Sequence, residues 1–96
     1  MLVKKKAKDK IRVTFTSPLI NDCDCLYLVG DFNGWDKTAQ PMKRNKEGMW
    51  SLTVHLEPGQ TYQYRYYTND DIWFNDSDPD DYHANPFGSD NSVVNT

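Results

Sequence analysis

The sequence predicts an all-β fold, an antiparallel β-sandwich of immunoglobulin-like type, within a single domain. Apolar and polar residues alternate in several short segments, which is the period of a β-strand with one buried face. Turn-forming residues separate these segments at short intervals, and no window shows helical periodicity of useful length. The chain has 96 residues, of which 38% are apolar and 14% aromatic, so it allows one modest core built largely from rings.

The first part of the chain is expected to hold a lead-in and two strands. Residues 1–9 are rich in lysine and are expected to form a flexible basic lead-in, which leaves residues 10–96 for the sandwich domain. Apolar and polar residues alternate in segment 11–16, which predicts a strand. Segment 25–29 is apolar on both faces, and this favours a central strand covered on both sides.

The middle of the chain is expected to hold three strands. Residues 41–44 are typical of a short strand, which a turn at 45–48 joins to the next one. Segments 50–56 and 61–67 each alternate strictly, and the turn between them, at 57–60, has Pro and Gly in their usual places. We therefore expect these two strands to pair as a hairpin with one apolar and one polar face.

The last third is expected to hold two short strands and a long acidic loop. Strands are predicted at 72–74 and 92–95, with an irregular loop at 75–89 between them. The aspartates of this loop place oxygens at alternate positions. The calcium-loop pattern nevertheless fails, because Asp81 stands where a glycine is needed and Phe87 where a bidentate glutamate is needed. We expect a solvated loop here.

Charge is distributed unevenly along the chain, although the net charge is only −3. Six of the eleven basic residues lie in the first twelve positions, while the chain after position 69 carries seven acids and no Lys or Arg. The acidic balance argues against nucleic acid as a partner, because phosphate affinity requires clusters of net positive charge. No apolar run could span a bilayer or serve as a secretory signal, so no membrane partner and a cytoplasmic location are expected.

Cys23 and Cys25 are expected to be reduced thiols, because neighbours at i and i+2 of a strand are poorly placed for a disulfide. Reduced thiols are consistent with a cytoplasmic protein. A zinc site would also need His55 and His83, and no second pair of ligands lies at the required spacing. We therefore expect neither a metal nor a cofactor.

The sequence offers little from which an active site could be assembled. None of the serines lies in a nucleophile-elbow motif. The crowded carboxylates of the acidic loop lack the rigid and different environments that separate two pKa values in a glycosidase. We therefore expect no catalytic residues and no enzyme.

Large aromatic residues in turn-rich segments are the strongest functional signal. Trp35 lies in the polar segment 31–36, Trp73 follows Asn-Asp-Asp, and Phe87 stands between Pro and Gly. Grouped exposed rings usually mark a binding surface, because apolar area left in water is costly. An indole can cover the C–H face of a pyranose while Asn, Ser and Arg side chains bond its hydroxyls. The alternative is that each indole packs inward as a satellite of the core.

Several spaced motifs together resemble the glycogen-binding carbohydrate-binding module (family forty-eight type). This module occurs in the β-subunit of AMP-activated protein kinase and, in related form, at the N-terminus of isoamylases and glycogen-branching enzymes. The resemblance implies an immunoglobulin-like sandwich of the early-set type that binds α-1,4-linked glucans. The matching segments are YLVGDFNGWD at 27–36, EPG at 57–59, YQYRY at 62–66, Trp73, and NPFGSDNSVV at 85–94.

The resemblance also implies roles for individual residues: two stacking tryptophans, a basic residue, an apolar finger and two hydroxyl ligands. The sequence departs from the family pattern in having Phe87 for a smaller leucine, Arg65 for a lysine, and one extra residue before Trp73. The planar fork of arginine can serve vicinal hydroxyls at least as well as lysine can. The expected carbohydrate-binding residues are, in chain order, Trp35, Arg65, Trp73, Phe87, Ser89 and Asn91.

The expected function is non-catalytic binding of an α-glucan polysaccharide or maltooligosaccharide, such as glycogen or starch. The alternative is a protein-interaction or accessory domain whose aromatic patch packs on a glucan-active enzyme or kinase partner without binding sugar. The ending at 85–94 looks closer to the enzyme-linked branch of the family, whereas the presence of both Trp35 and Trp73 favours sugar binding.

Overall fold

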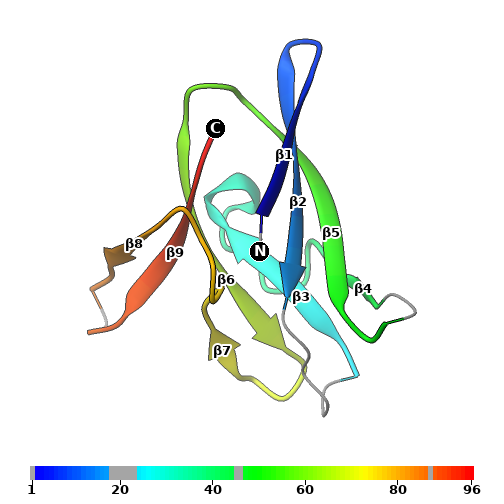
Figure 1. Cartoon of the computed structure of the whole chain (residues 1–96). Helices are drawn as coiled ribbons and strands as arrows, with labels where there is room; N and C mark the ends of the chain where they lie inside the picture. The colour runs from blue at the N-terminus through cyan, green and yellow to red at the C-terminus, as the bar shows by residue number, and fades with distance from the viewer. Residues whose placement is uncertain (1, 18–23, 45–46, 87) are drawn as a thin grey trace.

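Two antiparallel β-sheets pack face to face in the computed structural model, which describes residues 2–17, 24–44, 47–86 and 88–96. One sheet has the strand order β1-β2-β5-β4, and the other has the order β3-β6-β9-β8 with β7 paired to β6. Figure 1 shows β2 of the first sheet passing in front of β3 of the second. The expected all-β sandwich is confirmed.

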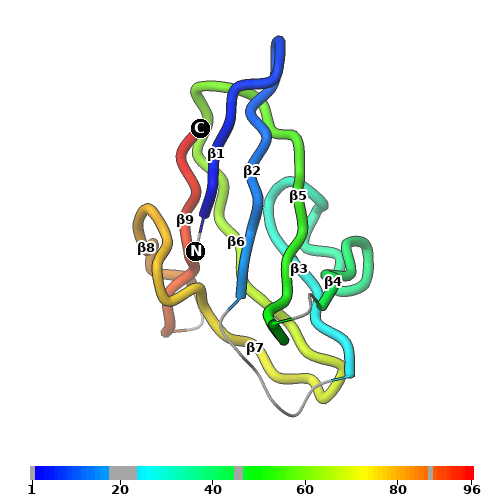
Figure 2. Tube along the Cα trace, turned by 45° about the vertical axis from the view of Figure 1, so that its right-hand side comes forward, coloured from blue at the N-terminus to red at the C-terminus, as the bar shows by residue number. Residues whose placement is uncertain are grey.

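The first sheet is built on β2, which pairs with β1 along one edge and with β5 along the other; Figure 2 shows the three strands side by side. The strands predicted at 11–16 and 50–56 are confirmed, and the one predicted at 41–44 is confirmed for its last two residues. The turn predicted at 45–48 lies partly outside the described residues. The strands are β1 (Leu2–Ala7), β2 (Lys10–Ser17), β4 (Lys43–Arg44) and β5 (Trp50–Leu56).

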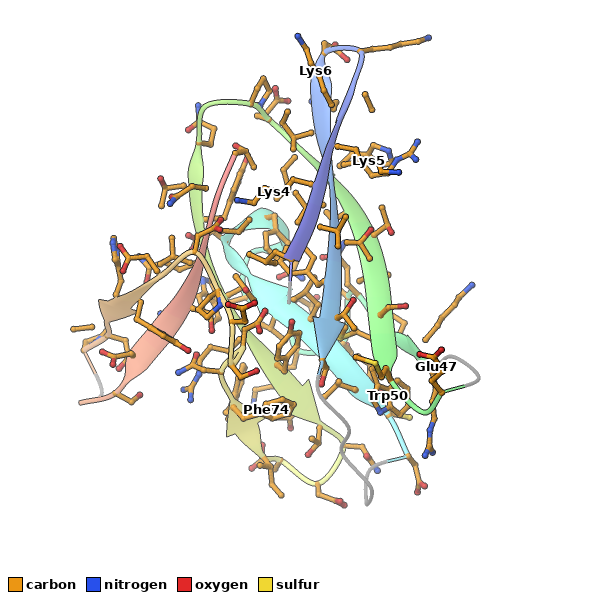
Figure 3. All side chains as sticks on the ribbon, in the orientation of Figure 1. Lys4, Lys5, Lys6, Glu47, Trp50 and Phe74 are labelled. Carbon is orange, nitrogen blue, oxygen red and sulfur yellow. The ribbon has the colours of Figure 1, made fainter. Side chains whose placement is uncertain are left out.

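Residues 2–7 do not form the flexible lead-in that their lysines predict; they form β1. Each of these six residues pairs with a residue of β2. The edge of β2 that faces away from β5 would otherwise be unpaired, and β1 covers it. Lys4 and Lys5 project to opposite sides of the strand (Figure 3), as strand geometry requires. Leu2 packs against the core, and Lys4 forms a 2.5 Å ion pair with Asp80. These contacts hold the basic segment on the sandwich.

The second sheet carries the strands that position the candidate site. The strands predicted at 61–67, 72–74 and 92–95 are confirmed within one or two residues of their ends. The segment predicted to be an irregular loop, 75–89, contains β8, whose residues are all exposed and so lack the alternation that reveals a strand. The strands are β3 (Leu26–Gly30), β6 (Thr61–Thr68), β7 (Trp73–Phe74), β8 (Asp81–Ala84) and β9 (Asp90–Asn95).

The prediction that β3 is a central strand was wrong, since β3 stands at the end of the sheet order. Its outer edge is covered by the segment 40–42, and the N–H of Leu28 donates to the carbonyl oxygen of Gln40 at 3.0 Å. Leu28 and Val29, on opposite faces of β3, are both fully buried. Both faces of β3 are therefore apolar because both are buried, while a loop, and not another strand, covers its outer edge.

The core between the sheets is centred on aromatic rings from β2 and β6. The ring centroids of Phe15 and Tyr64 lie 4.9 Å apart with an edge-on angle of 74°. Tyr66 continues the row, 6.0 Å from Tyr64. Both tyrosines and Phe15 have no exposed surface. Such edge-on pairs add about 0.5–1.5 kcal/mol each beyond the burial of area, so these rings are a main source of stability.

The predicted hairpin between β5 and β6 does not form, because β5 belongs to the first sheet and β6 to the second. The turn at 57–60 instead leads the chain from one sheet to the other. The apolar faces of both strands still meet the same core, but from opposite sides. Alternation reports which face of a strand is buried and not which strand lies beside it, so it could not separate the two arrangements.

Asp76 is buried beside the core and is not part of a solvated loop. One of its carboxylate oxygens accepts hydrogen bonds from the hydroxyls of Tyr64 at 2.8 Å and Tyr66 at 3.1 Å. Its N–H donates to the hydroxyl of Ser92 at 2.9 Å. Burial by itself raises the pKa of Asp76, but hydrogen bonds, including those from the N–H of Asp78 and from Tyr64, keep that pKa below its usual value. Burial raises the pKa of both tyrosines, so their hydroxyls stay protonated as donors.

The described residues include a single short helical turn, η1 (Asp31–Asn33), and no helix among them is long and apolar enough to cross a membrane. In the same ranges, no three His, Cys, Asp or Glu side chains come together as metal ligands could. Cys25 is an exposed free thiol, and Cys23 lies outside the described residues.

Candidate functional site

A pocket of about 680 Å³ opens on the outer face of the second sheet. Side chains alternate along β6, so the burial of Tyr64 and Tyr66 in the core directs Gln63 and Arg65 outward. Both residues line the pocket. The lining residues come from four parts of the chain and are Asp31, Trp35, Lys37, Gln63, Arg65, Trp73, Asn85, Pro86 and Asn91.

Two valines share the face of the sheet on which the pocket lies. Val29 stands directly opposite Arg65 across β3 and β6, and Val93 stands opposite Gln63 across β6 and β9. Directly opposite residues of antiparallel strands point to the same face. The exposed fraction is 0% for Val29 and 1% for Val93, although neither belongs to the core cluster between the sheets. The outer face of the second sheet is therefore covered at these two positions as well as on its core side.

The turn that follows β3 is closed by its own residues. Gly30 lies so close to β6 that a Cβ there would be 2.6 Å from the carbonyl oxygen of Gln63. The side chain of Asn33 accepts a bond from the N–H of Gly30 at 3.1 Å and donates to the carbonyl oxygen of Leu28 at 2.9 Å. Gly34 then takes a left-handed φ of 67°, which glycine adopts without strain. The turn is thus a rigid support for the residue that follows.

Trp35 extends from this turn into the pocket. Its own φ is 59°, a left-handed value that is a genuine outlier for a bulky residue and that occurs mainly where the surroundings enforce it. Its N–H donates to the carbonyl oxygen of Gly30 at 3.0 Å, and its indole N–H donates to Asp31 Oδ1 at 2.9 Å. The other oxygen of Asp31 accepts the N–H of Gln63 at 2.8 Å. Asp31 therefore links the indole of Trp35 to the backbone of β6.

Trp73 reaches the pocket from β7, where it stands opposite Tyr67 of β6. The ring centroids of Trp73 and Tyr67 are 4.7 Å apart, and Trp73 is half-buried. The ammonium group of Lys37 lies 5.3 Å from the centroid of Tyr67 and 5.9 Å from that of Trp73. Both distances are within the range of a cation–π contact.

A chain of amide groups also lines the pocket. Asn85 donates to the hydroxyl of Ser89 at 2.9 Å and to Asn91 Oδ1 at 3.2 Å. Asn91 in turn donates to Gln63 Oε1 at 3.0 Å. These bonds fix which way each amide points, so Asn91 and Gln63 present defined donors and acceptors to the pocket.

Arg65 is half-buried, and its Nε is shielded from solvent without a hydrogen-bond partner. A buried donor left unpaired costs about 1–3 kcal/mol, and more when it belongs to a charged group. Arg65 also lines the pocket, so a ligand with oxygen acceptors can meet its guanidinium group there.

Four of the six residues expected from the sequence line this one pocket: Trp35, Arg65, Trp73 and Asn91. Ser89 is exposed and does not line the pocket; it contacts the site through its bond with Asn85. Phe87 lies outside the described residues.

Five lining residues were not anticipated, and they are Asp31, Lys37, Gln63, Asn85 and Pro86. The alternation along β6 could have identified Gln63, since it shares a face with Arg65. The remaining four lie in turns, and only the folded chain shows that these turns meet.

The chain is similar to parts of several curated 1,4-alpha-glucan branching enzymes. It is 52% identical over 29 residues to the enzyme of Dictyostelium discoideum, a match that covers 30% of this chain and 4% of the relative. It is 41% identical over 44 residues to an enzyme of Xanthomonas campestris, covering 45% of this chain and 6% of the relative. It is 38% identical over 53 residues to an enzyme of Synechococcus, covering 54% and 7% respectively. The chain thus spans less than a tenth of the length of these relatives.

Residues 24–88 match a family described as Carbohydrate-binding module 48 (Isoamylase N-terminal domain). This range includes β3, the turn that carries Trp35, the whole of β6, and Trp73. The match covers well over half of the chain, and the two-sheet fold agrees with it. The chain therefore belongs to the carbohydrate-binding module 48 family.

Proposed function

We propose that the protein is a non-catalytic module that binds α-1,4-linked glucans, such as glycogen or starch, in the pocket on its second sheet. The observation that carries this proposal is the meeting of Trp35, Trp73, Arg65 and Asn91 around one pocket, although they come from four separate segments of the chain. Two half-buried indoles beside a guanidinium and an amide suit the mixed apolar and hydroxyl surface of a pyranose.

The lining residues divide naturally between two tasks. Trp35 and Trp73 supply flat apolar area for the C–H faces of glucose units. The guanidinium group of Arg65 donates to hydroxyl oxygens, and Asn91 and Gln63 offer the amide groups that their mutual bond orients. The pocket is open and covers only a few sugars, so we expect a Kd on the order of micromolar to millimolar.

Titration with maltoheptaose and with β-cyclodextrin, followed by tryptophan fluorescence and by calorimetry, tests this function. Stacking of a sugar on an indole should change the emission, and Trp35→Ala and Trp73→Ala should each weaken binding by about tenfold or more, since about 1.4 kcal/mol of lost contact corresponds to a factor of ten. Absence of binding up to millimolar ligand would refute the proposal.

Trp50→Phe is the matched control for these variants. Trp50 is 6% exposed in the core of the sandwich and does not line the pocket, so the change removes an indole without touching the site. Figure 3 shows Trp50 at the base of β5 in the first sheet. Equal loss of binding in Trp50→Phe and Trp35→Ala would mean that general destabilisation, and not sugar stacking, is being measured.

A second function is favoured by the shortness of the matches, because the chain covers only 4–7% of relatives that are branching enzymes. In this case the module serves as an accessory domain packed on a glucan-active enzyme or kinase subunit. A folded protein that ignores glucans, with a pocket covered by the partner chain in the complex, would favour this function. The cytoplasmic location stays a prediction that cell fractionation can test.

A further inference from the structure

The charged groups that line the pocket do not balance. Its lining includes two cations, Lys37 and Arg65, and one carboxylate, Asp31. The carboxylate is already engaged, because one oxygen accepts the indole N–H of Trp35 and the other accepts the N–H of Gln63. The described lining therefore has a net charge of +1, on a protein whose net charge is −3.

Neither cation is paired with an acid. In the part of the chain that the structure describes, the ion pairs join Lys4 to Asp80 and Lys10 to Glu57, and neither Lys37 nor Arg65 takes part in one. The Nε of Arg65 is buried without a hydrogen bond.

Lys37 is held where its charge faces the site. Its neighbour Asp36 uses its carboxylate to accept the N–H of Thr38 at 3.0 Å, which closes the turn around Lys37. The Lys37 ammonium lies near the rings of Tyr67 and Trp73, at 5.3 and 5.9 Å from their centroids. The nearby carboxylate of Asp71 accepts the hydroxyl of Tyr67 at 2.7 Å and does not line the pocket.

A neutral glucan explains the rings, the amides and the donors of Arg65, but it gives no reason for a second unpaired cation, Lys37, in the same pocket. Hydroxyl groups bond equally well to neutral donors, and placing like charges together in a cleft is unfavourable until an anion arrives. A phosphate ester supplies about −1.5 to −2 charges and three acceptor oxygens, enough to engage both an ammonium and a guanidinium.

We propose that the pocket prefers an α-glucan that bears a phosphate ester, with Trp35 and Trp73 holding glucose units while Lys37 and Arg65 bind the phosphate. This inference rests on the proposed glucan binding and adds a substrate class and a residue, Lys37, to it. The phosphate is recognised as a substituent of the sugar chain, because the cations lie within the same pocket as the stacking rings.

Calorimetric titrations with maltohexaose, with maltohexaose carrying one 6-phosphate group, and with inorganic phosphate alone test the inference. At low salt the phosphorylated sugar should bind roughly tenfold more tightly than the neutral one, because two partly exposed charge pairs are worth about 0.2–1 kcal/mol each. The preference should shrink at 0.5 M NaCl, whereas binding of neutral maltohexaose should hardly change. Inorganic phosphate alone should bind much more weakly than the phosphorylated sugar.

Lys37→Met keeps the length and apolar stem of the side chain and removes its charge. It should reduce the preference for the phosphorylated sugar, taken as the ratio of the two affinities measured on the same variant, by about fivefold, since one exposed charge pair contributes at most about 1 kcal/mol. Lys43→Met is the matched control, because Lys43 is exposed on β4 of the other sheet.

Equal affinity for the two sugars, or a preference that Lys37→Met leaves intact, would overturn the inference while the glucan-binding function stands. Tight binding of inorganic phosphate alone would also overturn it, because recognition would then not require the sugar. Failure of all three ligands to bind would refute the glucan-binding function itself.

Discussion

Gly30 ends β3, where it lies beside β6 and leads into the turn that carries Trp35. Replacing it with alanine tests how closely β3 and β6 pack at this position. Its φ of −172° is extended backbone that any residue adopts, so the effect of Gly30→Ala is purely steric. The new Cβ would lie 2.6 Å from the carbonyl oxygen of Gln63, 2.9 Å from Cβ of Tyr64 and 3.0 Å from a ring carbon of Phe32. The first two atoms belong to, or are fixed by, the backbone of β6, and they can move only if the strands separate.

Overpacking of this kind costs about 1–3 kcal/mol, and two rigid neighbours place Gly30→Ala at the upper end of that range. For a domain of this size each kcal/mol lowers Tm by about 4–8 °C, so a loss of about 12–24 °C is expected. Gly30 also bonds to Asn33 and Trp35, and separation of the strands should therefore weaken glucan binding as well.

Thermal unfolding followed by circular dichroism, with Gly59→Ala as the control, measures this effect. Gly59 has a φ of 71° with nothing within 4 Å of an added Cβ, so its replacement pays only the left-handed backbone cost of about 1–2 kcal/mol. If Gly30→Ala lowers Tm no more than Gly59→Ala does, the claim that β3 and β6 approach too closely for a side chain is incorrect.

Two further changes test the buried network and the turn. Asp76 has a folded pKa below its unfolded value, so its ionised form contributes stability above about pH 4 that is lost as the pH falls through the folded pKa. Asp76→Asn should therefore have a lower free energy of unfolding than the parent at pH 7. Urea unfolding should show this difference in free energy becoming smaller towards pH 3. A difference that stays constant with pH would contradict the ionised state of Asp76. Asn33→Ala removes three side-chain bonds, to Gly30, Leu28 and Gln40, and should cost about 3 kcal/mol at about 1 kcal/mol per bond. The same variant should bind maltoheptaose more weakly, and unchanged affinity would show that Asn33 does not position Trp35.

The elements predicted correctly from the sequence are those in which burial and alternation coincide. β2, β5 and β6 each carry apolar residues at every second position, and their rings and branched side chains fill one core. β1 and β8 could not be predicted in this way, because their exposed residues are held by pairing with a neighbour and carry no apolar period. The pairing of β4 with β5 was predicted correctly, but the pairing of β5 with β6 was predicted wrongly, because the two strands belong to different sheets and alternation does not report which strands are neighbours.

The site residues that could be predicted are those that stand out in the sequence. Trp35 and Trp73 stand out because indoles are unusual in polar turns, and Arg65 and Asn91 followed from the family resemblance. Asp31 and Lys37 are ordinary charged residues of a turn, and nothing in their immediate sequence signals their roles. Asp76 was expected in a solvated loop because its neighbours are acidic. In the structure its carboxylate is buried and accepts hydrogen bonds from the hydroxyls of Tyr64 and Tyr66.

β6 contains core tyrosines and pocket residues at alternating positions, so a shift of a single residue along this strand would exchange the two sets. Tyr64 and Tyr66 would then face solvent, and Gln63 and Arg65 would enter the interior. A point substitution in β6 therefore affects either the core or the pocket. An insertion or deletion within β6 would remove the interior packing and the ligand contacts together. Length variation between relatives should accordingly concentrate in the connecting segments on either side of this strand, such as the stretch between Tyr67 and Trp73.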